Sequence, residues 1–253
     1  MPRVARIKSN SGIYHIIMRG INRQTLFEDE EDCIKFIQTM LRYKEMCEYK
    51  IYAYCLMDNH LHLLLKEGKE PLETVMRRIC GSYVFWYNRK YGREGYLFQD
   101  RYKSEPVEDN IYFLTVIRYI FRNPIKAGIV TNIQNYKWTN YIDYIDGTYR
   151  TEIDFVLNLF DTERENSKRR FIEHINKDYD DKCLDIQEKQ RLTDHEARKI
   201  IKTHCKIDHA IDIQKFDIVK RNLYIKELKE RYGLSIRQVE RLTGISRGVI
   251  QRI

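Results

Sequence analysis

Two histidines separated by one residue, His60 and His62, lie in a leucine-rich stretch that extends to Leu65. If this stretch is a strand, both imidazoles project from the same face and could bind one cation together. The leucines favour a buried strand, where each neutral ring needs a polar partner. Two interpretations stay open from the residues alone: a metal site with two histidine ligands, or two hydrogen-bonded histidines on a sheet face.

Two acidic stretches, residues 28–32 and 105–109, could suggest a nuclease with two metal ions. Each precedes an expected helix, where carboxylates cap the first turn and complement the helix dipole, so we interpret both as structural. The six cysteines form no CxxC pair and fall mostly in apolar periodic segments. This pattern predicts reduced core thiols rather than disulfides or a zinc cluster.

The elements that would position the histidines alternate between strands and helices. Three segments rich in β-formers predict strands: residues 13–18, 50–57 and 61–66. Three segments with helical spacing of apolar residues predict helices: residues 29–47, 71–91 and 110–123. A fourth strand is expected within residues 98–107. The resulting β-α-β-β-α-β-α order predicts an α+β fold, a ferredoxin-like antiparallel sheet with helices.

The 253-residue chain is long enough for one sizeable core and a smaller second unit. Its net charge of +8 favours an anionic partner, whether nucleic acid, an acidic membrane surface or an acidic protein. The sequence has no run of 18 apolar residues and no apolar signal core near its N-terminus. We therefore expect a cytoplasmic protein with no membrane partner.

Four short motifs occur in order between residues 10 and 140. They are MRGINRQ at 18–24, MDNHLHLL at 57–64, QDRY at 99–102 and YIFRNPIKAG at 119–128. Together these motifs resemble the HUH single-tyrosine transposases, and within them the branch of IS200-like, REP-associated tyrosine transposases. The resemblance implies the HUH nuclease fold for residues 1–147, a DNA partner and a location at the bacterial nucleoid.

The resemblance also implies a mechanism. In this family the histidine pair and a third polar side chain hold a divalent ion, Mg2+ or Mn2+, and a helical tyrosine attacks the DNA phosphorus. Carried over by motif, the metal ligands are His60, His62 and Asn123, and the nucleophile is Tyr119. Asn123 precedes Pro124, which disfavours helical geometry at Asn123 and leaves its orientation open. The implied activity is cleavage and rejoining of single-stranded, hairpin-forming DNA through a 5′-phosphotyrosine intermediate.

The helix that would carry Tyr119 has an apolar side, which is made by Ile111, Leu114, Ile117, Ile120 and Phe121. Tyr119 falls on another side, so we expect it to face a cleft. A phenol with a pKa of about 10 is a weak nucleophile at neutral pH, and a bound metal ion could activate it.

Basic residues interleave with aromatic ones between residues 77 and 103, which is typical of surfaces that bind single-stranded DNA by charge and stacking. The aromatic residues could equally fill the core. In this part of the chain the expected DNA contacts are Arg19, Asn22, Arg23, Arg101, Lys103 and Arg122.

Beyond residue 147 the sequence changes to charged helical segments, so we expect a helical C-terminal region at 148–253. Ser235 and Ser246 resemble N-caps of two helices that are separated by a turn at Gly244. This pattern predicts a helix-turn-helix within 222–253 and duplex DNA as a further partner, although any three-helix module would show similar periodicity. Its expected DNA contacts are Arg237, Arg241, Arg247 and Arg252.

Two alternatives belong to other functional classes. One is a DNA-binding regulator, inactive or domesticated, on the same fold. The other is a Zn2+ hydrolase that uses His60 and His62, for which a third ligand and a base are hard to name. Both a monomer and a homodimer are compatible with the sequence.

Overall fold

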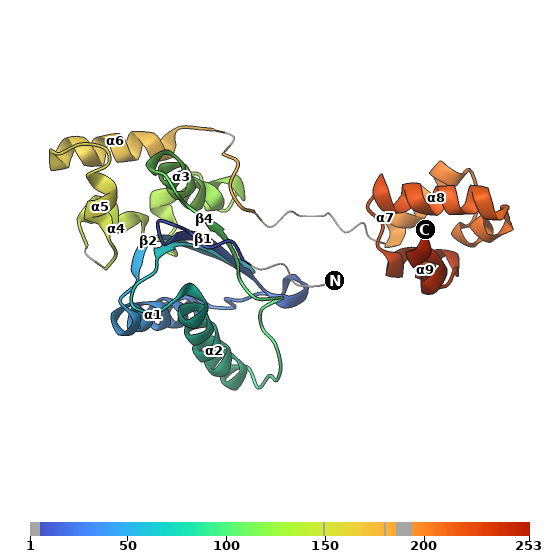
Figure 1. The fold of residues 1–253 in the computed structure, drawn as a ribbon, viewed down its shortest axis with the longest axis horizontal. Helices are drawn as coiled ribbons and strands as arrows, with labels where there is room; N and C mark the ends of the chain where they lie inside the picture. Colours follow the sequence, from blue (N-terminus) through green and yellow to red (C-terminus); the bar gives the residue numbers. More distant parts are fainter. Residues whose placement is uncertain (1–5, 149, 180, 186–193) are drawn as a thin grey trace. The chain divides into compact units, whose positions relative to one another are not determined.

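The computed structural model describes residues 6–148, 150–179, 181–185 and 194–253 (Figure 1). The chain forms two compact units, Met1–Asp185 and Ile186–Ile253. The first unit contains two hydrophobic clusters and the second contains a third. No helix in the described ranges is long and apolar enough to cross a membrane.

The first unit is built on one four-stranded antiparallel sheet with the order β2-β3-β1-β4. Its strands are β1 (Ile13–Arg19), β2 (Lys50–Met57), β3 (His60–Lys66) and β4 (Lys103–Pro106). Asp58 and Asn59 form the tight turn between β2 and β3, as their sequence predicts. The α+β, ferredoxin-like prediction is confirmed. The fourth strand is shorter than the expected 98–107, because Arg101 and the residues before it form a loop.

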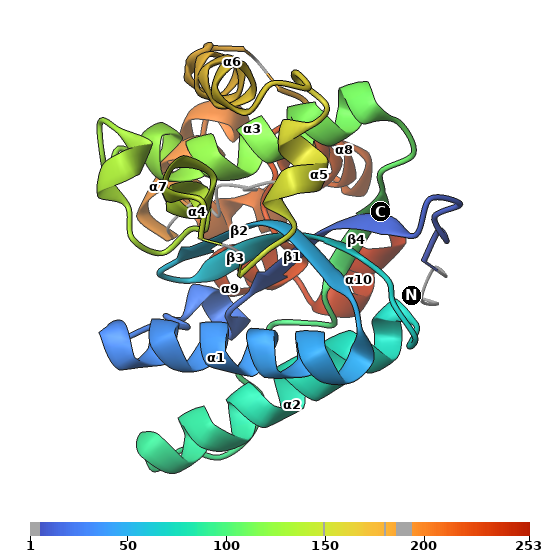
Figure 2. The ribbon, with the colours of Figure 1, turned by 90° about the vertical axis from the view of Figure 1, so that its left-hand side faces the viewer.

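Helices cover both faces of the sheet (Figures 1 and 2). α1 (Glu30–Cys47) and α2 (Leu72–Lys90) lie on one face, and α3 (Asn110–Lys126) lies on the other. Asp29 caps α1 in a reciprocal capping box with Asp32, and Asp109 caps α3 by accepting from the Tyr112 amide. Much of the acidic sequence before these helices therefore has the predicted capping role.

Side-chain alternation along the central strands divides the interior into two cores. Ile16 and Met18 on β1, with Leu61 and Leu63 on β3, pack in the cluster that includes α1 and α2 residues. Leu64 packs in the cluster that includes α3 residues. Because β3 alternates, His60 and His62 share the face of Leu64 and point toward α3.

Short helices after α3 extend the second cluster. They are η2 (Ile133–Asn135), α4 (Tyr141–Asp146), α5 (Ile153–Leu157) and α6 (Arg164–Asn176). Tyr144 of α4 stacks on Phe171 of α6 with ring centroids 4.5 Å apart, and Phe171 also packs against Phe121 of α3. Residues 148–185 thus share the core of the first unit, so the structural boundary falls near 185 rather than at the expected 147.

The second unit is helical, as predicted for the C-terminal region. It contains α7 (Asp194–Cys205), η3 (Ala210–Lys215), α8 (Ile218–Glu230), α9 (Ile236–Thr243) and α10 (Arg247–Arg252). The Ser235 side chain caps α9, and Gly244, at φ 72°, ends it. The cluster joins Ala197 and Ile201 of α7 to residues of α8, α9 and α10. The unit therefore starts later than the expected helical region at 148–253, and it includes helices before the expected helix-turn-helix at 222–253.

Candidate active site

Three aromatic side chains from the sheet and α3 meet between these two layers. The ring of Tyr119 on α3 lies 5.5 Å from that of His62 and 5.8 Å from that of His15, both edge-on. His60 completes the group, with its ring centroid 5.3 Å from that of His62. The structure therefore brings together the two histidines and the tyrosine that the motifs selected.

His62 is fully buried, and its two ring nitrogens have different surroundings. Nδ1 lies 3.2 Å from Nε2 of His15, whereas Nε2 has no hydrogen-bond partner within the described residues. Burial and the neighbouring His15 and His60 rings lower the pKa of His62 well below its usual value. A neutral imidazole with an unpartnered buried nitrogen fits a metal ligand.

His60 begins β3 and is partly exposed, next to the turn from β2. Its Nδ1 is 2.8 Å from the side-chain oxygen of Asn59. An amide oxygen accepts, so Nδ1 is the protonated nitrogen and Nε2 carries the lone pair. The turn residue thus selects the tautomer in which His60 can also bind a cation through Nε2.

Tyr119 is buried, with 4% of its surface exposed. The expectation that it faces an open cleft is therefore wrong. Residues 116–121 of α3 are all buried, and residues 181–185 return to this helix. Burial raises the pKa of the Tyr119 phenol well above its usual value, and the nearby carboxylate of Asp185 raises it further. Helix periodicity could not reveal this cover, because the covering segment lies more than 60 residues away.

Asn123 lies one turn after Tyr119 and is fully within α3, because the helix continues through Pro124 to Lys126. The bias against helical geometry before proline is overridden here, since α3 packs against the sheet and α6. The side-chain Nδ2 of Asn123 donates to the Tyr119 carbonyl at 3.0 Å. Its amide oxygen is then the atom suited to bind a cation.

The ring of His62 has two neighbouring imidazoles, those of His15 and His60, and Asn123 lies one helical turn beyond Tyr119. In the parts of the chain that the structure describes, no three His, Cys, Asp or Glu side chains form a metal-binding group. Within the described residues, the histidine pair therefore fits an open cation site rather than a closed structural zinc site.

Sequence reasoning missed two members of the site, His15 on β1 and Glu105 on β4. The acidic stretch 105–109 was interpreted as helix capping, but Glu105 accepts from His15 Nδ1 at 2.9 Å. The two residues are direct partners in the antiparallel register of β1 and β4. Only this register, between strands about 90 residues apart, shows the relationship.

The loop after β1 holds several expected DNA contacts beside the histidine strand. Arg19 is the register partner of His60, and the Gly20 amide donates to the Asn59 carbonyl at 2.9 Å. A side chain at Gly20 would meet the Gln24 carbonyl oxygen at 2.0 Å, so only glycine fits. The exposed Asn22 and Arg23 follow in the short helix η1 (Ile21–Arg23), both in left-handed conformation.

The remaining basic candidates of the first unit differ in their surroundings. Arg101 and Lys103 are exposed, the first in the loop before β4 and the second at its start. Arg122 instead binds Asp178 at 2.7 Å and the Asn176 carbonyl at 3.1 Å. Because its guanidinium holds the segment after α6 against α3, we leave Arg122 out of the proposed DNA interface.

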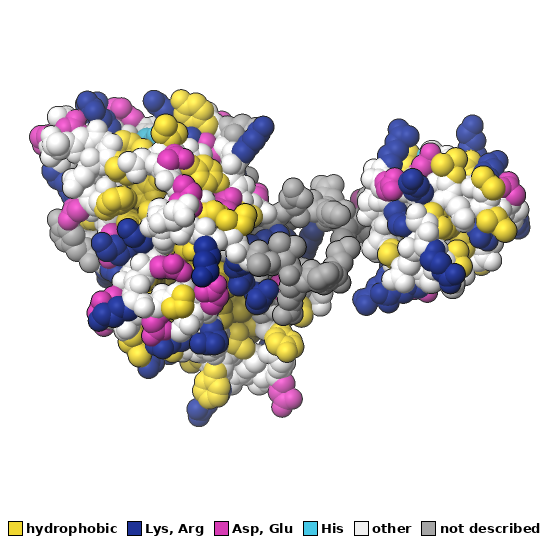
Figure 3. All heavy atoms as spheres, in the orientation of Figure 1, with side chains coloured by type: hydrophobic (Ala, Val, Ile, Leu, Met, Phe, Trp, Pro, Cys, Tyr) yellow, Lys and Arg dark blue, Asp and Glu magenta, His cyan; other side chains and the backbone are white. Residues whose placement is uncertain are grey.

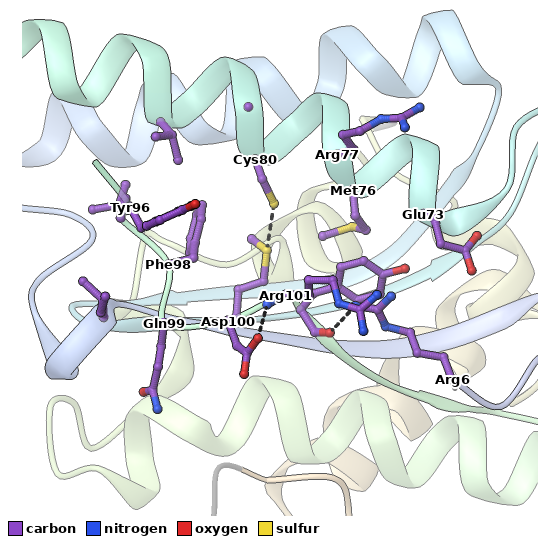
Figure 4. Close-up of a pocket in the computed structure, with 16 residues that line it drawn as sticks. Arg6, Glu73, Met76, Arg77, Cys80, Tyr96, Phe98, Gln99, Asp100 and Arg101 are labelled. Atoms are coloured by element: carbon purple, nitrogen blue, oxygen red, sulfur yellow. Dashed lines mark hydrogen bonds between the residues drawn. The ribbon is translucent and has the colours of Figure 1, made fainter. Parts of the chain in front are cut away.

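A cavity of about 770 Å³ lies on the opposite face of the sheet from Tyr119, between α2 and the loop before β4. Figure 4 shows Met76 and Cys80 of α2 facing the loop residues Phe98 and Arg101. Cys80 Sγ is 3.3 Å from the sulfur of Met18 on β1. Its lining includes neither Tyr119 nor His62, so this cavity is separate from the group around Tyr119.

The C-terminal unit carries most of the net charge of the chain. Residues 186–253 contain sixteen Lys and Arg against nine Asp and Glu, a net charge of +7 out of +8 for the chain. Arg237, Arg241, Arg247 and Arg252 are all exposed, and Arg241 pairs with Asp194 at 2.5 Å. In Figure 3 basic side chains occur on the visible faces of both units, with acidic ones among them.

Comparison with known proteins gives matches to transposases. Residues 8–123 match the family model of IS200-like transposases, a segment that begins before β1 and ends at Asn123. This segment is less than half of the chain, and through it the chain is similar to the IS200-like transposases.

Two similar proteins carry related descriptions. A Haemophilus influenzae protein assigned as a REP-associated tyrosine transposase is 25% identical over 113 residues, which cover 39% of this chain and 64% of that protein. The chain thus matches less than two thirds of its relative's length. A solved REP-associated tyrosine transposase bound to a REP hairpin is 15% identical, with a TM-score of 0.51, covering 74% of this chain and 100% of that one. This likeness shows the fold.

Proposed function

We propose that the first unit cuts and rejoins single-stranded DNA, with Tyr119 as the nucleophile and His60, His62 and Asn123 as ligands of a divalent cation, Mg2+ or Mn2+. The observation that carries the proposal is the position of Tyr119, whose ring lies 5.5 Å from that of His62. The Nε2 atom of His62 is buried without a hydrogen-bond partner in the described chain.

In the proposed reaction the Tyr119 oxygen attacks a backbone phosphorus. The bond between phosphorus and the 3′ oxygen breaks, the 3′ oxygen takes a proton, and the 5′ phosphate stays on Tyr119. A divalent cation, when bound, supplies charge that polarises the phosphate oxygens and favours loss of the phenol proton. Since one phosphoester replaces another, a 3′-hydroxyl can attack the linkage and rejoin the strand.

The chain's own residues explain why such help is needed. Burial and Asp185 both raise the pKa of the Tyr119 phenol, so this group is a poorer nucleophile at neutral pH than free tyrosine. A cation held by His62, whose ring lies 5.5 Å from that of Tyr119, would add positive charge that offsets that effect. A DNA strand that enters this site must also meet the segment 181–185, whose Leu184 amide donates to Glu105.

We propose that the DNA is a hairpin-bearing single strand. The solved relative whose fold the chain shares is bound to a REP hairpin, which supports this choice. On the first unit the proposed contacts are Arg19, Asn22, Arg23, Arg101 and Lys103.

We further propose that α9 and α10 form a helix-turn-helix that binds duplex DNA. The net charge of +7 on residues 186–253 supports this proposal, since phosphate neutralisation supplies most non-specific affinity. Arg237, Arg241, Arg247 and Arg252 are the proposed contacts.

A covalent trapping assay tests the catalytic proposal. The protein is incubated with Mn2+ or Mg2+ and a pool of single strands that carry a hairpin beside a randomised segment, and is then denatured. A label at the 3′ end of the DNA should stay with the protein, whereas a label at the 5′ end should leave on the released fragment.

Two matched variants complete the assay. Tyr119→Phe should form no adduct, while Tyr141→Phe, which changes another buried tyrosine of the same core, should keep it. An adduct in Tyr119→Phe would refute the assigned nucleophile. Specific DNA binding by the wild type without any adduct would favour the non-catalytic regulator instead.

A further inference from the structure

Three side chains on neighbouring strands form a continuous chain beneath α3. Glu105 lies on β4, His15 on the adjacent β1, and His62 on β3 beyond it. His15 Nδ1 is 2.9 Å from Glu105 Oε1, and His15 Nε2 is 3.2 Å from His62 Nδ1. Both imidazoles are fully buried, so water does not interrupt the chain.

This chain of hydrogen bonds has a direction, because Glu105 at its start can only accept a hydrogen bond. An ionised Glu105 has no proton to donate, so Nδ1 of His15 carries the hydrogen. In a neutral His15 the other nitrogen, Nε2, then bears a lone pair and accepts. His62 must donate to it from Nδ1, which leaves the lone pair of His62 on Nε2.

Nε2 of His62 is the end of this chain and has no hydrogen-bond partner among the described residues. A buried lone pair without a donor costs free energy that a bound cation would recover. The same nitrogen belongs to the ring that lies edge-on to Tyr119. These hydrogen bonds thus leave the lone pair of His62 Nε2 available beside Tyr119.

We propose that Glu105 and His15 are positioning residues that hold His62 in the tautomer with a proton on Nδ1, so that its Nε2 can bind the catalytic cation. This inference rests on the metal site of the proposed function. It assigns roles to two residues outside the motifs.

Two further hydrogen bonds hold the Glu105 carboxylate in place. The same Oε1 atom also accepts from the Tyr112 hydroxyl at 2.7 Å and from the Leu184 amide at 2.8 Å. Burial raises the pKa of Glu105, but the hydrogen bonds from His15, Tyr112 and Leu184 outweigh burial and leave that pKa lowered. The carboxyl group therefore stays ionised and keeps its accepting role.

A protonated His15 would reverse the outcome. As an imidazolium it would donate from both nitrogens, to Glu105 and to His62 Nδ1, and the hydrogen of His62 would move to Nε2. The site would then present an N–H group that repels a cation. The two states differ in one observable, the protonated nitrogen of His62.

Nitrogen NMR of the metal-free protein decides between these states. Two-bond correlations from the ring carbons' protons identify the protonated nitrogen of each histidine, with His62→Gln used to assign the resonances. We expect Nδ1–H and a bare Nε2 at His62 in the wild type. A proton on Nε2 of His62 at neutral pH would overturn the proposal without any variant or activity assay.

A Mn2+ titration of three proteins gives the second readout. Glu105→Gln has an amide that can donate to His15 and reverse the chain, so its Mn2+ dissociation constant should rise about 10- to 100-fold. Glu108→Gln is the matched control, since Glu108 accepts from the Asn10 and Ser11 amides and does not contact His15. It should match the wild type.

The outcomes separate this inference from the proposed function. Glu105→Gln that keeps both the His62 tautomer and Mn2+ affinity within about two-fold of the wild type would overturn the positioning role; measured effects of such partners are larger. Failure of the wild type to bind Mn2+ would overturn the metal site itself. An absent adduct with normal Mn2+ binding would contradict only the catalytic proposal.

Discussion

The ring of Tyr119 lies edge-on to that of His62, with centroids 5.5 Å apart, although one belongs to α3 and the other to β3. The two elements meet because Leu64 and the strand residues that share its face pack against α3. Strand alternation and helix packing together therefore place a candidate nucleophile beside a candidate metal ligand.

Removing the metal should stop the reaction without unfolding the protein. The core on this face is formed by aromatic and aliphatic side chains, and the donor set is not a closed structural site. We expect EDTA to abolish adduct formation while the melting temperature shifts by less than about 2 °C, which corresponds to a small change in stability. Cooperative unfolding on EDTA addition would show a structural metal instead.

Asn140 is expected to be a main support of the edge strand β2. Its side-chain oxygen accepts from the Tyr54 amide at 2.8 Å, and its Nδ2 donates to the Tyr52 carbonyl at 3.0 Å. Asn140→Ala leaves the buried Tyr54 amide and Tyr52 carbonyl without these hydrogen bonds. It should lower the free energy of unfolding by about 1–3 kcal/mol in urea titrations. The exposed Asn135→Ala should change it by less than about 0.5 kcal/mol. Equal stabilities would contradict this role.

Burial of Asp143 should make the free energy of unfolding depend on pH. Burial raises the pKa of this carboxyl group to about 6, so the folded state holds its proton more tightly than the unfolded chain, whose carboxyl has a pKa near 3.8. Between these values the Asp143 contribution to stability falls as pH rises. As pH rises from 4 to 7, the free energy of unfolding of Asp143→Asn should increase by about 1–2 kcal/mol relative to that of the wild type. The pKa shift sets an upper limit of roughly 3 kcal/mol.

The check is a series of urea unfolding curves for both proteins across that pH range. Thr151, which lies 3.4 Å from the Asp143 carboxylate, can also donate to the variant amide oxygen, so the fold should be kept. A constant difference between variant and wild type at all pH values would contradict the assigned pKa.

The sequence was a sound guide to the local structure and a poor one to long-range relationships. Periodicity predicted α1 and α2 closely, and alternation placed His60 and His62 on one face. The link between His15 and Glu105 depends on strand register. The burial of Tyr119 depends on residues 181–185, which no motif covers. The unit boundary depends on aromatic packing at Phe171.

The second unit predicts a separable DNA affinity. Its hydrophobic cluster is its own and includes Ala197 and Ile201, so a truncation within α8 would expose that core. Ending the chain at residue 185 should instead weaken duplex binding and spare adduct formation. Unchanged duplex affinity in the truncated protein would contradict a DNA-binding role for the second unit.

Single charges test the same surface. Arg247→Gln should reduce the slope of log affinity against log salt by about one if this side chain contacts one phosphate. Lys69→Gln is a control, because Lys69 belongs to the first unit, outside α9 and α10, and pairs with Glu48. Equal slopes for Arg247→Gln and the wild type would remove Arg247 from the interface.

The central claim is that Tyr119 forms the covalent bond to DNA, and mass spectrometry of the digested adduct tests it directly. Trypsin cleavage at Arg118 and Arg122 should release residues 119–122, a peptide whose one tyrosine is Tyr119. We predict that this peptide, or a longer one with a missed cleavage, carries the nucleotide mass on Tyr119. A nucleotide found on any other tyrosine would contradict the account.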